Sequence, residues 1–101
     1  MLVFEIAGPL FFGAALRFQH VMKEVSDKHR VVVLRMKYVP MIDATGIKRL
    51  EDMVKGMQAR HRRVYLTDLV PAVERELQGQ TWFTPELCAK NLAEVLRKIG
   101  R

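Results

Sequence analysis

The sequence predicts an α/β fold: a mostly parallel β-sheet of about four strands, flanked by about four α-helices. The first reason is that segments with strand and helix patterns alternate along the chain, as in folds whose parallel strands are joined by helices. The second is that residues 31–34 contain no polar side chain, a pattern typical of a strand covered on both faces. The third is the length of 101 residues, which suits a single domain.

The first half of the chain contains two strand patterns and one helix pattern. Residues 1–7 predict a strand that is apolar and ends at Gly8 and Pro9. Residues 14–27 predict a helix, because apolar side chains recur there at spacings of three and four. Residues 30–36 predict the second, central strand.

The second half continues the alternation to the end of the chain. Residues 43–60 predict a long helix, 63–67 a third strand, 71–78 a short helix and 81–83 a brief strand. Residues 85–99 predict a last helix with Thr84 as N-cap, Pro85 in the first turn, and Arg97 and Lys98 at the carboxyl end. In that helix Cys88 would share an apolar stripe with Leu92, Val95 and Ile99, which favours a core position for its side chain.

Parallel strands would gather the loops 8–13, 37–43 and 68–70 at one edge of the sheet, where open α/β sheets bind ligands. Asp43 there can cap the following helix, and Thr45 and Gly46 offer backbone donors at its positive end. Two interpretations stay open: a plain helix cap, or a recognition loop for a phosphate or for an acidic group of a partner.

Four segments together resemble the STAS domain, in the form found at the cytoplasmic C-terminus of SulP-family anion transporters. Residues 3–15 resemble its first strand and GPLFF-type loop, 31–36 its central strand, 39–46 its signature loop, and 64–73 its third strand with the turn that follows. The resemblance implies a non-catalytic regulatory domain that contacts the transporter membrane domain and cytosolic proteins. It also implies one domain over residues 1–101, cut from a longer transporter of sulfate, bicarbonate or dicarboxylate.

The resemblance places the partner-binding residues in the two loops at that edge: Leu10, Phe11, Phe12, Ile42, Asp43, Ala44, Thr45 and Gly46. We expect at least one of the two phenylalanines to fold onto the core and the other to be an exposed anchor. Related anti-sigma-factor antagonists are phosphorylated on a serine in the signature loop. Here Ala44 takes that place, which disfavours the alternative of a free-standing antagonist-type protein and leaves Thr45 as a substitute site of phosphorylation.

The net charge of +6 permits nucleic acid, anionic lipid or an acidic protein as partner. Loops that follow helices would bring basic residues to the opposite edge of the sheet, where strands begin. We expect that edge to face anionic lipid or an acidic partner, although cations at helix ends also have a local stabilising role. The residues of this predicted basic edge are Lys28, Arg30, Arg60, Arg62 and Arg63, with His29 and His61 beside them.

Other functions find little support in the sequence. Ser26 is the only serine and has no glycine elbow, and the three histidines lack metal-ligand spacing. Asp43 and Asp68 share an edge and could hold a cation, but Asp43 is expected to serve as a cap. No phosphate-binding glycine motif and no nucleic-acid-binding motif is present, so we expect no cofactor, no metal and no nucleic acid. Weak nucleotide binding at the start of the 43–60 helix stays open.

Overall fold

In the part of the chain that the structure describes, four parallel strands form a single sheet in the order β1-β2-β3-β4. The computed structural model describes residues 1–8 and 30–100. The described elements, in chain order, are β1 (Leu2–Ala7), β2 (Val31–Tyr38), α2 (Ala44–Ala59), β3 (Arg63–Thr67), α3 (Pro71–Gln78), the 3₁₀ helix η1 (Pro85–Leu87), β4 (Cys88–Ala89) and α4 (Leu92–Ile99).

The predicted α/β class is confirmed, and so are the strands predicted at 1–7, 30–36 and 63–67. The helices predicted at 43–60 and 71–78 are confirmed as α2 and α3. The helix predicted at 14–27 lies outside the described residues. Among residues 30–100 and 1–8, no helix combines the length and apolar character that crossing a membrane would require.

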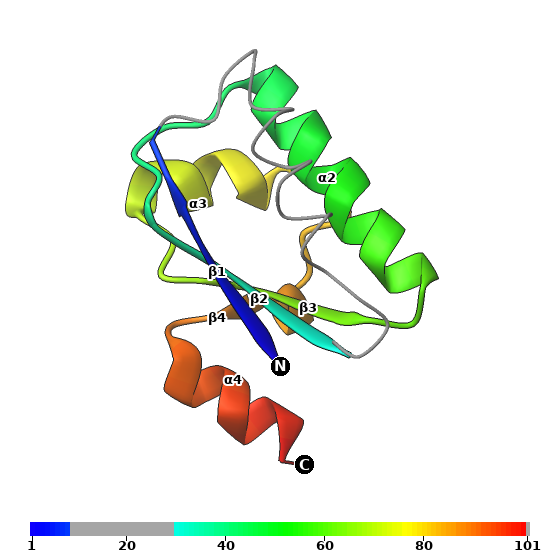
Figure 1. Ribbon diagram of the computed structural model, residues 1–101. Coiled ribbons are helices and arrows are strands. Elements are labelled where there is room, and N and C mark those ends of the chain that lie inside the picture. Colours follow the sequence, from blue (N-terminus) through cyan, green and yellow to red (C-terminus); the bar gives the residue numbers. More distant parts are fainter. Residues whose placement is uncertain (9–29, 101) are drawn as a thin grey trace.

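The central strand β2 is covered on both of its faces, as its apolar run predicts. Val32 and Leu34 belong to the larger core, under helices α2 and α3. Val33 belongs to a smaller core on the other face, together with Tyr65 and Val95. Figure 1 shows α2 and α3 on one side of the sheet and α4 on the other. The alternating side chains of one strand therefore hold two layers of helix to the sheet.

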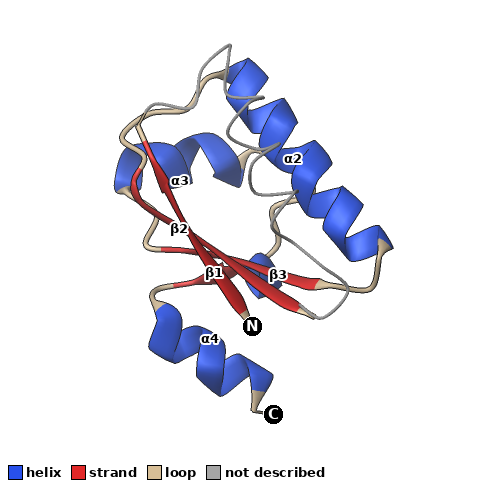
Figure 2. Cartoon of the chain, in the orientation of Figure 1, coloured by secondary structure: helices blue, strands red, loops and turns tan. Residues whose placement is uncertain are grey.

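The prediction of one continuous helix over 85–99 is wrong. The chain makes a single 3₁₀ turn, then the short strand β4, and only then helix α4, as Figure 2 shows. Residues 88–89 pair with Leu66 and Thr67 of β3, so backbone pairing with the sheet replaces helical bonds there. A second cap starts the true helix, because the side chain of Asn91 accepts from the Glu94 N–H at 3.0 Å.

Three smaller expectations about this region are also wrong. Residues 81–83 form a turn instead of a strand, with the Phe83 N–H donating to the Gln80 carbonyl oxygen. Thr84 and Pro85 do stand at the N-cap and in the first turn, but of the 3₁₀ helix η1, and Thr84 makes no side-chain capping bond. Cys88 lies partly exposed on the edge strand and not on the apolar stripe of a helix. All three differences arise because residues 88–89, and not 81–83, form the fourth strand of the sheet.

Candidate functional site

The loop between β2 and α2 lies at the edge of the sheet where the parallel strands end. Asp43 has an extended backbone, with φ −104° and ψ 179°, and its Oδ1 accepts from the Gly46 N–H at 2.8 Å. Its carbonyl oxygen accepts from the Ile47 N–H at 2.9 Å. Asp43 is therefore the N-cap of α2, as predicted, and its carboxylate is engaged within the chain.

The residues of this loop differ in what they offer to a partner. Ala44 is exposed and Thr45 is partly exposed, whereas Gly46 is buried. Ile42 is 7% exposed and belongs to the larger core, so its side chain supports the loop from below. Met41 is 54% exposed and was not among the predicted site residues. The sequence did contain a signal that Met41 could be a site residue, because this apolar side chain lies between Pro40 and Ile42 and belongs to no strand pattern.

The end of β1 lies beside the end of β2 at this same edge. The Gly8 N–H donates to the Tyr38 carbonyl oxygen at 2.8 Å, and Ala7 pairs with Tyr38 in the strand register. Gly8 has φ 87°, a backbone conformation that suits glycine. The predicted site residues Leu10, Phe11 and Phe12 follow in the chain and lie outside the described residues. Exposed Tyr38 adds an aromatic side chain to this edge.

A group of ion pairs, not foreseen from the sequence, joins three strands near the same edge. Arg35 Nη1 lies 3.2 Å from Glu5 Oε1 on β1, and Arg35 Nε lies 3.6 Å from Asp68 Oδ2 beyond β3. Asp68 has φ 57°, in the left-handed region. With Asp43 acting as a cap and Asp68 paired with Arg35, the two carboxylates that could have held a cation each have another partner, as the expected cap at Asp43 implied. Within residues 1–8 and 30–100 there is no group of three or more His, Cys, Asp or Glu that could hold a metal.

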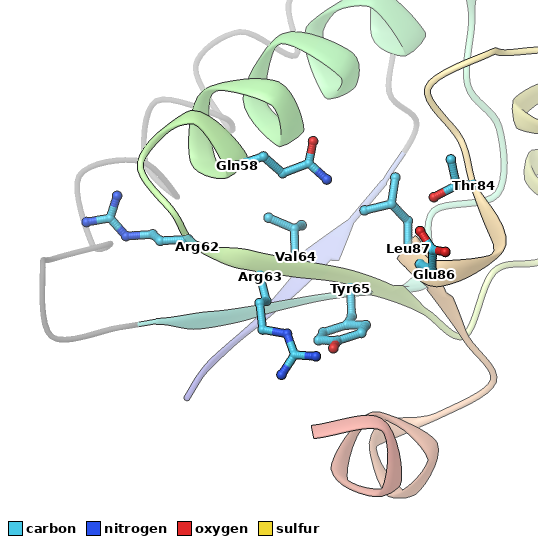
Figure 3. Close-up of a pocket in the computed structure, with 8 residues that line it drawn as sticks. All are labelled: Gln58, Arg62, Arg63, Val64, Tyr65, Thr84, Glu86 and Leu87. Carbon is cyan, nitrogen blue, oxygen red and sulfur yellow. The ribbon is translucent and has the colours of Figure 1, made fainter. Parts of the chain in front are cut away.

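At the opposite edge, where strands begin, the structure brings part of the predicted basic edge together. The Arg63 N–H donates to the Arg30 carbonyl oxygen at 2.8 Å, which places β2 and β3 side by side at their starts. Arg30, Arg60 and Arg63 are exposed, but Arg62 is only 7% exposed. Figure 3 shows the side chains of Arg62 and Arg63 pointing in different directions from the start of β3. Lys28 lies outside the described residues.

The thiol of Cys88 has the character of a weak nucleophile. Burial raises the pKa of Cys88 above its ordinary value of 9.0, and the nearby carboxylates of Glu74 and Glu94 raise it further, while Lys98 opposes them. Since the thiolate is the reactive form, this environment disfavours nucleophilic chemistry at neutral pH.

Comparison with protein families matches residues 1–94 to the family model described as STAS domain. Comparison with curated proteins finds no significant sequence match. Among solved structures, a sulfate transporter family protein from Wolinella succinogenes is 26% identical with a TM-score of 0.83, over 98% of this chain and 84% of that one. The SulP transporter STAS domain from Vibrio cholerae is 26% identical with a TM-score of 0.78, over 98% of this chain and 83% of that one.

The fold also occurs within a much longer transporter chain. The murine Solute Carrier 26 family member A9 anion transporter, in its inward-facing state, is 16% identical with a TM-score of 0.85. The match covers 98% of this chain but 18% of the transporter. At that identity the likeness concerns the fold, and it shows that a domain of this architecture is a minor part of a larger protein there.

Proposed function

The chain belongs to the STAS domain family, and from this premise we propose that it is the non-catalytic, cytoplasmic regulatory domain of a SulP-type anion transporter. The observation that carries the proposal is the similarity over almost the whole chain to the STAS domain of the Vibrio cholerae SulP transporter and to the Wolinella succinogenes protein. In this proposal the domain controls anion transport by contact with the membrane domain and with cytosolic proteins.

The proposed contact surface is the edge where the strands end. Its described part consists of Tyr38, Met41, Ala44 and Thr45. Leu10, Phe11 and Phe12, which the sequence predicts for the same surface, follow Gly8 in the chain and lie outside the described residues. Two exposed side chains, Tyr38 and Met41, are large and apolar, the kind that anchors protein interfaces. The Asp43 cap and buried Ile42 hold the loop in a fixed conformation, which lowers the entropy cost of binding.

We assign the opposite, basic edge to the anionic surface of the membrane. Arg30 and Arg60 are exposed there, and a cation close to an anionic surface contributes about 1 kcal/mol of binding free energy. Co-sedimentation with phosphatidylserine vesicles tests this assignment against vesicles of phosphatidylcholine alone. The double variant Arg30→Glu and Arg60→Glu should lose the binding, and binding that ignores both the variant and the lipid charge would contradict it.

A switch by phosphorylation has weaker support in this chain. Ala44 has no hydroxyl group, which argues against the alternative of an antagonist-type signalling protein. Thr45 is partly exposed and stands as the substitute site of modification. Mass spectrometry after incubation with the cell lysate and ATP tests whether Thr45 is phosphorylated. An unmodified Thr45 would contradict this switch.

The reading frame that contains this chain provides the first test of the proposal. We expect it to encode several membrane-spanning segments before the domain, and a frame without them would contradict the proposal.

The second test is uptake of radiolabelled sulfate, bicarbonate and dicarboxylate by proteoliposomes that contain the complete protein. Ala44→Arg should lower the transport rate, whereas Ala93→Arg, an equal change at an exposed position on α4, should leave it unchanged. Thermal unfolding of both variants separates lost contact from lost fold.

A further inference from the structure

The sheet has an incomplete edge beside the first half of β3. Strand β4 has two residues and pairs only with Leu66 and Thr67, so among residues 1–8 and 30–100 no strand lies beside Arg63, Val64 and Tyr65 on that side. Residues 85–87, which would have continued β4 backward, form η1 instead. An edge of this kind offers backbone donors and acceptors to another extended chain.

The direction of the backbone groups can be followed along β3. The Arg63 N–H points toward β2, because it donates to Arg30. Since backbone groups alternate from side to side along a strand, those of the even-numbered residues point toward β4. Leu66 indeed pairs with β4, and the Asp68 N–H donates to the Lys90 carbonyl oxygen at 3.2 Å. In the described part of the chain, no backbone hydrogen bond joins Val64 to η1 or to the turn before it.

A hollow of about 330 Å³ lies along this part of β3, within the size range of ligand sites. Figure 3 shows Gln58, Val64 and Leu87 on one side of the strand, and Arg63 and Tyr65 on the other. The hollow therefore follows the strand edge and receives side chains from both faces of the sheet. It is lined by Gln58, Arg62, Arg63, Val64, Tyr65, Thr84, Glu86 and Leu87.

We propose that this edge binds an extended acidic segment of a partner protein, which adds to the sheet beside β3 by pairing with Val64. A strand bound in this way takes its affinity from main-chain hydrogen bonds and its specificity from alternate side chains. This inference rests on the sheet edge and would hold whether or not the domain is part of a transporter.

Charge selects the kind of segment. Exposed Arg63 lies at the start of β3, and Glu86 lies at the opposite end of the hollow from Arg62 in Figure 3. An acidic side chain is therefore favoured near Arg63, and a neutral or basic one near Glu86. The two arginine side chains point in different directions, so they do not converge on one small anion. An extended peptide, whose successive side chains point to opposite faces, matches this arrangement.

The test uses the ¹⁵N-labelled chain and a short synthetic peptide of alternating glutamate and valine with a lysine at its carboxyl end. Titration followed by NMR should shift the Val64 amide signal and slow its exchange with solvent. Arg63→Glu should weaken binding about tenfold or more, as expected for a charge at the binding site. Arg60→Glu makes the same charge change in the preceding turn, outside the hollow, and should have a much smaller effect.

A second peptide separates strand pairing from charge attraction. It carries N-methyl groups on its central valines, which removes their N–H donors and leaves its charge unchanged. Loss of binding by this peptide supports the proposal. Equal binding of both peptides, no binding at millimolar concentration, or signal shifts confined to residues 41–46 would each overturn it.

Discussion

The Nζ atom of Lys98 on α4 lies 3.2 Å from the carbonyl oxygen of Pro85 in η1, and it also donates to the carbonyl oxygen of Cys88. One side chain thereby satisfies carbonyl groups on both sides of the step from 3₁₀ helix to strand. This connection links the last helix to the irregular segment before it, and it explains how a two-residue strand is held in place.

Lys98→Met should lower the free energy of unfolding by about 1 kcal/mol, because it removes the charged donor from the exposed carbonyl oxygen of Pro85 and the partly buried one of Cys88. Urea denaturation measures the change, and hydrogen exchange should show that α4 opens more often. Arg97→Met is the matched control, since Arg97 is an exposed neighbour in the same turn. Equal effects of the two substitutions would show that the bond to η1 contributes nothing.

Asp43→Ala should destabilise the domain by about 1 kcal/mol, because the Gly46 N–H loses its acceptor at the start of α2. Asp43→Asn keeps a side-chain oxygen in the same place and should retain most of the stability. The midpoints of urea denaturation distinguish these cases. If Asn proved as harmful as Ala, the negative charge and not the capping bond would be the important feature.

Val95→Ala should cost about 1 to 3 kcal/mol, because Val95 is fully buried in the smaller core between α4 and the sheet. Leu96→Ala removes more atoms from the next residue but should change stability by less than about 0.5 kcal/mol, since Leu96 is 52% exposed. Thermal or urea unfolding of both variants tests the orientation of α4. A larger effect at Leu96 would mean that the helix faces the sheet differently.

Alkylation of Cys88 should be slow near neutral pH and should rise with a midpoint above 9.0, because burial raises the pKa of the thiol. Glu74→Gln removes a negative charge that raises this pKa, so it should move the midpoint down. Lys98→Met removes a positive charge and should move it up. Iodoacetamide reaction followed by mass spectrometry measures the rates. A midpoint below 9.0 in the folded domain would contradict the structure.

Within residues 1–8 and 30–78 the sequence predicts the strands and helices well, because each has a clear periodic pattern and its own boundary residues. The uninterrupted apolar run of β2 indicated two covered faces, and the smaller core at Val33 confirms it. The region after Gln78 was predicted wrongly, because Thr84 and Pro85 form a plausible helix start by local rules. Pairing of Cys88 and Ala89 with β3 is a contact between distant residues, and no local pattern could reveal it.

Local sequence rules predicted some features of the candidate site and missed others. The cap at Asp43 was predictable, because it depends on residues three positions apart. The ion pairs of Arg35 with Glu5 and Asp68 were not, since they join three strands whose register was unknown. The burial of Arg62 was missed for a similar reason. Adjacent residues at the start of a strand point in different directions, and only the fold decides which one is covered.

The brevity of β4 also bears on how the domain avoids self-association. Long, flat and apolar strand edges allow identical molecules to stack into aggregates, and natural sheets interrupt such edges with short strands and charged groups. Here strand β4 has only two residues, and the charged residues Arg63 and Glu86 lie beside the part of β3 that β4 does not cover. Two copies that approach through this uncovered part find few free backbone groups to pair with, and the net charge of +6 on each copy adds repulsion between them. We therefore expect the concentrated domain to remain free of fibrils.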